Sequence, residues 1–442
     1  MLRFAFPLLL LSFLETIVAG ELTYAPAPVD NPLKGLVPYL SAPNTERFPH
    51  SLKFQYFSLK QLNSAKDTYD WSKLESALTK SQDAGCQMIL RIYLEYPGKE
   101  SGMPDFLIDE GVKLTEWEAD GSKNLTPDYE DPRLREALTK FITAFGEKYD
   151  GDPRIGFITV GLLGMWGEWH NYPRTDLWAS KETQVLVLNA FEKSFSRTRL
   201  LLRYPAGPNN PHMAKTIDRP FGYHDDSFSW ATLKTGKPED DWYFLNSLEK
   251  AGGLNTWKKH PIGGETRPEL WPTFFTDTKH ERDQGFDRCV QETHASWLLD
   301  SGVFDARFDL PPKRLERATK SVQKMGYEFY VSSWEYRGGG VELSVENRGN
   351  APFYYNWPLI LEVYDAEEKL ISTAQSVSNI STLLPGESAI WSFYKVEGLN
   401  EASYRVRIPN PMPGGKSLRF ANETEGNMGL ILGTLADGMK KD

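Results

Sequence analysis

Short apolar runs alternate with amphipathic segments over the first three quarters of the chain. The runs are rich in Ile, Leu, Val and Phe, which is typical of strands buried on both faces, and the segments between them repeat their apolar residues at the period of a helix. This alternation predicts α/β architecture, and eight such units in about 300 residues predict a (β/α)8 barrel. The predicted strands are residues 35–40, 53–59, 87–96, 155–165, 199–205, 221–227, 260–265 and 295–299, and the predicted helices include 72–84, 132–149, 181–195, 239–251 and 312–325.

The third predicted strand indicates which of its faces points inward. Aliphatic side chains occupy every second position from Met88 to Leu94 and are expected to pack on the helices. The other face carries Arg91 and Glu95, which are expected to point into the barrel, with Glu95 near its carboxyl-terminal mouth. Because a lone buried charge is costly, Arg91 should have acidic partners there. The long segment 97–131 follows this strand and is predicted to be a loop over the mouth.

After Gly326, apolar and polar residues alternate strictly, and the spacing of apolar residues is no longer that of a helix. Residues 341–345 alternate, 359–372 has the pattern of a hairpin, and further strands follow at 388–394 and 403–408. Turn signals separate these runs, so this part is predicted to be a C-terminal antiparallel β-sandwich domain. The predicted organisation is a signal peptide at 1–20, the barrel at 21–326, the sandwich at 327–425 and a short tail at 426–442.

The first residues have the pattern of a secretory signal peptide. Arg3 precedes an apolar stretch at 4–13, and small residues at 18–20 offer a cleavage site. This stretch is too short to span a bilayer, and no later run is long enough, so we expect a secreted, extracellular protein without a membrane span. Three glycosylation sequons agree with that location, and their acceptors are Asn124, Asn379 and Asn422.

Composition narrows the partners and leaves the cysteines open. The chain has 442 residues and a formal net charge of -10, which argues against a nucleic-acid or anionic-membrane partner. Aromatic residues make up 13%, a surplus that suits a ligand cleft as well as a core. Cys86 and Cys289 are the only cysteines, and either one disulfide or two buried thiols would fit a chain of this length.

Polar and aromatic residues gather at the carboxyl-terminal ends of the predicted strands, where function resides in barrels of this type. Glu168 and Glu265 follow glycines at the ends of the fourth and seventh strands, which lie across the barrel from each other. Cleavage of a glycosidic bond requires two such carboxyl groups, one to protonate the leaving oxygen and one to attack or stabilise the anomeric carbon. The further candidates for carbohydrate binding are Arg91, Glu95, Trp166, His170, Arg203, Tyr223, His224, Asp225, Arg267 and Trp297.

Each glutamate also has a structural interpretation. Glu168 could pair with Arg91 or Arg203 inside the barrel, and Glu265 could cap the helix that follows it. Most tryptophans are expected in the core, and Trp166 and Trp297 are the best placed to stack on a sugar ring.

Histidines and a carboxylate at the mouth also raise the possibility of a metal-dependent hydrolase. His170, His224 and Asp225 could contribute ligands. The chain lacks a tight metal-binding spacing such as H-x-H or H-E-x-x-H, so neither a metal nor another cofactor is expected.

These residues together resemble the clan of TIM-barrel retaining glycoside hydrolases. In that clan the acid/base glutamate follows strand four and the nucleophile follows strand seven. The resemblance implies that Glu168 is the acid/base and Glu265 the nucleophile. It also implies binding roles for Tyr223 after strand six and Trp297 on strand eight.

The mature chain as a whole resembles a group of secreted barrel-plus-sandwich proteins of unknown function in bacteria and fungi. The resemblance rests on residues 31–35, 164–170 and 345–352. The chain departs from the larger clan at two positions. Gly167 stands where the clan has an asparagine, and Arg91 lies on the third predicted strand where the clan's arginine lies on the second.

The sequence therefore predicts a secreted glycoside hydrolase that acts on an oligo- or polysaccharide. A separation of roughly 5–5.5 Å between the two carboxyl groups would indicate a retaining mechanism, and roughly 6.5–9.5 Å an inverting one. The alternatives are a non-catalytic glycan-binding protein on the same scaffold and a metal-dependent hydrolase. The identity of the sugar stays open.

Overall fold

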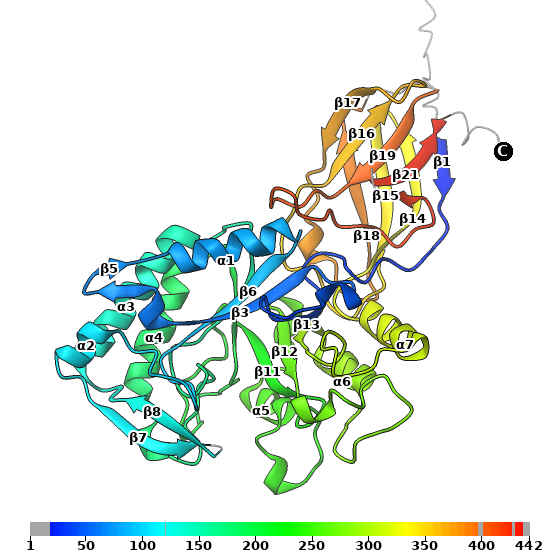
Figure 1. The fold of residues 1–442 in the computed structure, drawn as a ribbon. Coiled ribbons are helices and arrows are strands. Elements are labelled where there is room, and N and C mark those ends of the chain that lie inside the picture. Colours follow the sequence, from blue (N-terminus) through cyan, green and yellow to red (C-terminus); the bar gives the residue numbers. More distant parts are fainter. Residues whose placement is uncertain (1–17, 120, 397–400, 427–428, 436–442) are drawn as a thin grey trace, which may run out of the picture.

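A barrel of parallel strands forms the centre of the molecule. The sheet has eight strands in the order β2-β13-β12-β11-β10-β9-β6-β3. A bridge between Tyr39 and Phe54 joins the two ends of this order, so the sheet closes and the predicted (β/α)8 barrel is confirmed. The computed structural model describes residues 18–119, 121–396, 401–426 and 429–435 (Figure 1). The barrel strands are β2 (Gly35–Val37), β3 (Leu52–Ser58), β6 (Gln87–Tyr93), β9 (Ile155–Thr159), β10 (Arg199–Leu202), β11 (Gly222–Phe228), β12 (Ile262–Thr266) and β13 (Ala295–Leu299).

Helices lie between most successive strands and cover the outside of the barrel (Figure 1), and of the connections that the structure describes only those after β2 and β10 contain no α-helix. Helix α3 (Pro132–Tyr149) shows why the helices form where they do. At its start, Asp131 accepts a hydrogen bond from the backbone N–H of Arg133, and Pro132 stands in the first turn. Along the helix, the buried residues recur at helical spacing. The predicted helix 239–251 begins only at Phe244, after a short 3-10 turn. The helices are α1 (Ser72–Asp83), α2 (Asp105–Asp109), α3 (Pro132–Tyr149), α4 (Lys181–Ser194), α5 (Phe244–Ala251), α6 (Phe286–Thr293) and α7 (Pro312–Gln323).

The segment after β6 contains more regular structure than a loop. It holds α2 and an antiparallel hairpin of β7 (Leu114–Ala119) and β8 (Ser122–Pro127). A smaller hairpin of β4 (Asn63–Ala65) and β5 (Thr68–Tyr69) follows β3. In Figure 1, β7 and β8 project from the side of the barrel that lies away from the sandwich.

The two faces of β6 pack as the alternation predicted. Met88, Leu90 and Ile92 lie in the core between strands and helices. Ile89 lies in the barrel interior with side chains of the neighbouring strands, such as Phe157. Arg91 shares this inner face, at the level where the apolar filling of the barrel ends.

Two antiparallel sheets form the C-terminal sandwich, and their inner faces share one core. The sandwich is larger than predicted at both ends. The N-terminal strand β1 pairs with β14, and β21 pairs with β19 inside the second sheet, so residues 429–434 of the predicted tail form a sandwich strand. The predicted signal peptide overlaps β1 at residues 18–20, and residues 1–17 lie outside the described residues. The strands are β1 (Val18–Glu21), β14 (Phe329–Arg337), β15 (Gly340–Asn347) and β18 (Ser388–Tyr394) in one sheet, and β16 (Ile360–Tyr364), β17 (Leu370–Gln375), β19 (Ser403–Arg407), β20 (Glu425–Gly426) and β21 (Gly429–Thr434) in the other.

The sandwich packs against the amino-terminal end of the barrel. The Tyr355 hydroxyl donates to the backbone oxygen of Gly156 (2.6 Å), at the start of β9, and Arg199, at the start of β10, donates through Nε to the backbone oxygen of Tyr354 (2.9 Å). Apolar side chains of both domains form one continuous cluster there. The sandwich therefore closes the bottom of the barrel and leaves the opposite mouth free.

The three sequon asparagines have different surroundings. Asn124 is fully buried, and its amide donates to Glu95 Oε2 (2.7 Å). Asn422 is also buried, and its amide donates to the backbone oxygen of Val331 (2.8 Å). A glycan on either nitrogen would disrupt these contacts, so the expectation of modification at these two positions is incompatible with the fold. Asn379 is exposed.

Cys86 lies beside the start of β6 and Cys289 within α6, and both are buried free thiols. Of the two alternatives, two buried thiols is therefore the one that the structure shows, and not a disulfide. None of the helices in the described ranges is both long and apolar enough to cross a membrane.

Candidate active site

Glu168 reaches the mouth from a tightly turned loop and not from a strand. β9 ends at Thr159, so the predicted strand to residue 165 is wrong beyond that residue. Left-handed backbone angles at Leu162, Trp166 and Trp169 break up the extended conformation. The apolar sequence resembles a buried strand because Leu162, Leu163 and Trp169 still pack into the core.

The conformation of this loop explains why residue 167 is a glycine. Its φ is +71°, and a Cβ there would lie 3.0 Å from the backbone oxygen of Ile92. An asparagine, which the resembling clan has at this position, would need this crowded space next to β6. The positive φ and the lack of space for a side chain explain why a glycine stands at position 167.

Two glycines bring Glu265 close to its neighbours on β12. A Cβ on Gly263 would lie 2.3 Å from the Trp297 ring, and one on Gly264 would lie 2.7 Å from the backbone oxygen of Asp225. Larger residues would force β12 away from β11 and β13. The Gly-Gly-Glu sequence thus places the carboxyl group of Glu265 at the mouth, beside the end of β11.

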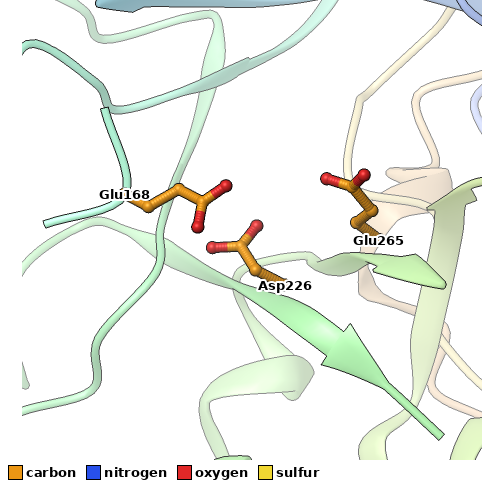
Figure 2. A group of neighbouring side chains, drawn as sticks. All are labelled: Glu168, Asp226 and Glu265. Carbon is orange, nitrogen blue, oxygen red and sulfur yellow. The ribbon is translucent and has the colours of Figure 1, made fainter. Parts of the chain in front are cut away.

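A third carboxylate joins the two predicted ones. Figure 2 shows Glu168, Asp226 and Glu265 reaching a common space from three separate segments of the chain. Carboxylate oxygens of all three lie within 4.8 Å of one another. The prediction of Asp225 at this place is wrong, because Asp225 accepts hydrogen bonds from Thr232 and Ser227 away from the mouth, and Asp226 points into it.

Arg91 connects these carboxylates at the base of the mouth. Its Nη1 lies 3.0 Å from Glu168 Oε1, and its Nη2 lies 3.0 Å from Asp226 Oδ1. Nε donates to Thr159 Oγ1 (3.0 Å), which fixes the plane of the guanidinium. Arg91 therefore has the acidic partners that its burial requires, and its fork binds two carboxylates at once.

Arg203 and two histidines complete the charged cluster. Arg203 Nε lies 2.5 Å from Asp226 Oδ2 and 3.8 Å from Glu168 Oε2. His170 Nε2 lies 3.7 Å from Glu168 Oε2, and burial, followed by the charge of Arg203, lowers the pKa of His170. His224 Nδ1 contacts Asp226, and burial lowers the pKa of His224. Glu168 and Asp226 are thus both neutralised by guanidinium groups.

Glu265 differs from its two acidic neighbours in having no such partner. It makes no ion pair and accepts no hydrogen bond within the part of the chain that the structure describes. Burial, followed by the charges of Glu168 and Asp226, raises the pKa of Glu265 to about 8. At neutral pH a protonated Glu265 therefore lies beside two carboxyl groups that face guanidinium groups, an arrangement by which one site separates an acid from a base.

The three carboxylates are also close enough to hold a metal ion. Both oxygens of Asp226 already face cations or an imidazole, and the guanidinium groups of Arg91 and Arg203 lie at 2.5–3.0 Å from Asp226. A divalent cation would have to compete with these charges for the same lone pairs. The surroundings of these carboxyl groups are those of an acid cluster whose charge is neutralised by arginine side chains.

Glu95 lies outside this cluster and has a supporting role. It is fully buried and accepts hydrogen bonds from Tyr129 (2.5 Å), Thr126 (2.5 Å), Asn124 (2.7 Å) and Asn171 (3.0 Å). These donors come from the β7–β8 hairpin and its flank and from the end of the Glu168 loop. The predicted contact of Glu95 with substrate is therefore wrong, and its carboxylate holds two loops of the mouth together.

Three further predicted binding residues also lie away from the mouth. Tyr223 is buried on the outer face of β11, in the core between strands and helices, and its hydroxyl lies 3.2 Å from Thr216 Oγ1. Asp225 accepts from Thr232 Oγ1 (2.6 Å), and burial raises the pKa of Asp225 to about 7. Trp297 is 0% exposed and stacks on Phe157 at 5.8 Å inside the barrel, so it cannot offer its face to a sugar.

The rim of the mouth carries the remaining predicted residues. Trp166 lies near His170, with ring centroids 6.2 Å apart. Arg267 pairs with Glu269 (2.8 Å) and lies over the ring of Trp230 at 5.5 Å. Arg267 therefore lies at the edge, two residues beyond Glu265.

Sequence reasoning missed a set of tyrosines along one side of the mouth. The ring of Tyr56 lies 6.4 Å from that of Tyr39 and 5.9 Å from that of Tyr96, and Tyr96 in turn lies 6.3 Å from Trp166. The hydroxyl of Tyr56 accepts from Arg91 Nη1 (3.4 Å). Tyr56 could have been found from the alternation of its strand, because it shares the inner face with Phe54.

No known protein family and no curated protein matches the chain in sequence. Among solved structures, endo-glycoceramidase II from Rhodococcus sp. is 12% identical, with a TM-score of 0.42 over 85% of this chain and 100% of that chain. A Bifidobacterium longum protein in complex with Manb1-4GlcNAc is 10% identical, with a TM-score of 0.37 over 62% and 69%. An endo-beta-mannanase/endo-beta-glucanase of Prevotella bryantii is 11% identical, with a TM-score of 0.34 over 62% and 42%. Within the barrel, Arg91 lies on the third strand, β6.

Proposed function

We propose that this protein is a glycoside hydrolase that cleaves glycosidic bonds with Glu168 and Glu265. The observation that carries the proposal is the approach of these two carboxyl groups across the mouth, with oxygens within 4.8 Å of each other. This approach is nearer to the roughly 5–5.5 Å of retaining enzymes than to the roughly 6.5–9.5 Å of inverting ones. It supports a retaining mechanism with a covalent intermediate.

The charges favour roles opposite to those implied by the resemblance. Arg91 stabilises the carboxylate of Glu168 at 3.0 Å, whereas Glu265 has a pKa of about 8 and carries a proton at neutral pH. We therefore assign proton donation to the leaving oxygen to Glu265. Glu168 then attacks the anomeric carbon, and Glu265, now ionised, takes a proton from the water that releases the sugar.

The test is a screen of the purified protein against a panel of aryl glycosides and polysaccharides, with Glu168→Gln and Glu265→Gln alongside. We expect hydrolysis by the wild-type protein and a loss of at least about a thousandfold in kcat for each variant. Asp225→Asn is the matched control, because this neighbouring carboxyl group points away from the mouth. Turnover that survives in both glutamine variants would contradict the proposal.

A non-catalytic glycan-binding protein is the second candidate. The Arg91–Glu168 ion pair favours it, because glutamates held in salt bridges are expected of a site that only binds. This candidate does not explain why Glu265 has no cationic partner and a raised pKa. Binding of a glycan that is identical in the wild type and in Glu265→Gln, with no turnover in either, would select this candidate.

Secretion is part of the same proposal and rests on the sequence of the first twenty residues. Its test is the amino-terminal sequence of the protein recovered from the culture medium of an expressing cell.

A further inference from the structure

Residues 164–171 form the loop that carries Glu168, and the backbone of this loop is strained. Trp166 and Trp169 have φ angles of +54° and +59°, in the left-handed region that large side chains rarely adopt. A backbone conformation of this kind costs free energy and persists only where the surrounding structure holds it. The position of Glu168 therefore depends on contacts that fix the loop from outside.

Both ends of this loop are tied to the side chain of Glu95. At the first end, the backbone N–H of Gly164 donates to the hydroxyl of Tyr129 (2.8 Å), and this hydroxyl donates to Glu95 Oε1 (2.5 Å). At the second end, the side-chain amide of Asn171 donates to the same oxygen (3.0 Å). One carboxylate oxygen thus holds the chain on either side of Glu168.

The backbone of Glu95 fixes the middle of the same loop. Its carbonyl oxygen accepts from the N–H of Trp166 (2.9 Å), and Glu95 and Met165 pair as an isolated parallel bridge. The loop also closes on itself, because the N–H of Met165 donates to the backbone oxygen of His170 (3.0 Å). The turn that bears Glu168 is therefore held by the main chain as well as by the side chain of Glu95.

The β7–β8 hairpin fixes the carboxylate of Glu95 from its other side. Asn124 and Thr126 donate to Oε2 at 2.7 Å and 2.5 Å, so the carboxyl group cannot turn without breaking these bonds. Glu95 is 0% exposed, and among the described residues no cation pairs with it. A buried carboxylate that accepts from several neutral donors has a defined orientation, which it passes on to the groups bound to it.

We propose that Glu95 is a positioning residue, which holds the carboxyl group of Glu168 opposite that of Glu265. It acts through Tyr129 and Asn171. The inference rests on the proposed function and adds to it the residues on which the alignment of the two reacting groups depends. Catalytic groups must be held within roughly 0.5 Å of their productive geometry, and a displacement of about 1 Å can lower the rate about a hundredfold. Loosening an anchor should thus slow the chemical step more than it weakens the binding of substrate.

Two conservative variants each remove one anchor of the loop. Tyr129→Phe takes the acceptor from the N–H of Gly164 and keeps the ring, and Asn171→Ala takes away the second donor to Glu95. We expect each to lower kcat about tenfold and to change KM by less than about twofold. The kinetics are measured with the glycoside that the wild-type protein hydrolyses. Glu95→Ala removes both anchors but leaves several buried donors unpaired, so the two milder variants carry the test if it does not fold.

Tyr149→Phe is the matched control. The hydroxyl of Tyr149 also donates to a glutamate, Glu75 (2.8 Å), and the tyrosine is buried, but it lies at the end of α3 that leads into β9, at the amino-terminal end of the barrel. We expect an unchanged kcat in this variant, and thermal unfolding checks that all variants are folded. Equal losses of kcat in Tyr129→Phe and Tyr149→Phe would overturn the proposal, and so would a wild-type kcat in both Tyr129→Phe and Asn171→Ala.

Hydrogen–deuterium exchange tests the anchors without turnover. The hydroxyl of Tyr129 protects the amide hydrogen of Gly164, so the peptide that spans residues 164–171 should exchange faster in Tyr129→Phe and at the wild-type rate in Tyr149→Phe. Unchanged exchange of this peptide in Tyr129→Phe would overturn the proposal. A wild-type protein that hydrolyses no glycoside rejects the proposed function instead, and faster exchange in Tyr129→Phe then still supports the anchoring of the Glu168 loop.

Discussion

The guanidinium of Arg91 lies 3.0 Å from the carboxylate of Glu168, and both side chains are largely withdrawn from solvent. The same guanidinium holds Asp226 at 3.0 Å, so one cation stabilises two carboxylates. The third carboxyl group of the site, Glu265, has no cation of its own. Glu265 is therefore the member of this group whose pKa is raised, to about 8, by burial and by the two neighbouring carboxyl groups.

Replacing Arg91 should destabilise the fold as well as abolish activity. Arg91→Met leaves two enclosed carboxylates without their shared cation, and we expect a loss of about 3–5 kcal/mol in the free energy of unfolding at neutral pH. Urea denaturation measures it. Arg267→Met is the control, because Arg267 forms a rim ion pair and should cost less than about 1 kcal/mol. A change of less than about 1 kcal/mol for Arg91→Met would show that the cluster is not held by this arginine.

Activity should fall at alkaline pH as Glu265 loses its proton. The pKa of Glu265 near 8 sets the alkaline limb of the profile of kcat/KM, because the free enzyme must hold the proton that it donates. Asp226→Asn removes a negative charge that raises the pKa of Glu265, so the limb should move to lower pH.

Asp225→Asn controls for the loss of a carboxyl group on the same strand and should leave the limb in place. An alkaline limb that does not move in Asp226→Asn would contradict the assignment of Glu265 as the proton donor.

The raised pKa of Glu265 also predicts how stability depends on pH. An unfolded glutamate releases its proton near 4.5 and the folded one near 8, so the unfolded state binds fewer protons between these values, and stability is lost as the pH rises through this window. Glu265→Gln removes that loss. We expect the variant to be more stable than the wild type by about 1–2 kcal/mol at about pH 9 and nearly equal to it at about pH 4. Thermal unfolding at the two pH values measures the difference, and equal differences at both would reject the shift.

Metal removal should leave activity unchanged. The oxygens of Asp226 are committed to Arg91, Arg203 and His224, so the acid cluster is neutralised by side chains of the chain itself. Assay after extensive dialysis against a chelator tests this expectation. Activity that is lost and then restored by a divalent cation would instead indicate the metal-dependent hydrolase.

The barrel strands and the two glutamates could be predicted because each depends on local sequence. Alternation on β6 placed Arg91 inward, and the glycines before Glu265 marked a strand end at the mouth, whereas Glu168 reaches the mouth from a loop beyond β9. Asp226 was missed because two adjacent aspartates gave no sign of which faced inward. The register between β11 and β12 also shifts after Asp225.

Other features depend on contacts between distant segments, which the sequence does not display. The loop that carries Glu168 turns through left-handed residues such as Trp166 and Trp169, although its apolar sequence continues the strand pattern. Glu95 is directed away from the mouth by donors of the β7–β8 hairpin, more than two dozen residues later in the chain. Trp297 is a barrel-filling residue because β12 contributes a glycine opposite its ring.

The most direct test of the central claim is covalent labelling with 2-deoxy-2-fluoro glycosides. These probes form a glycosyl-enzyme intermediate that is hydrolysed slowly, and peptide mass spectrometry locates the sugar on the attacking carboxylate. With the glycoside that the wild-type protein hydrolyses, we predict one added sugar on the peptide that contains Glu168, and none in Glu168→Gln. A label on Glu265, or no label on either glutamate in protein that turns over the parent glycoside, would contradict the account.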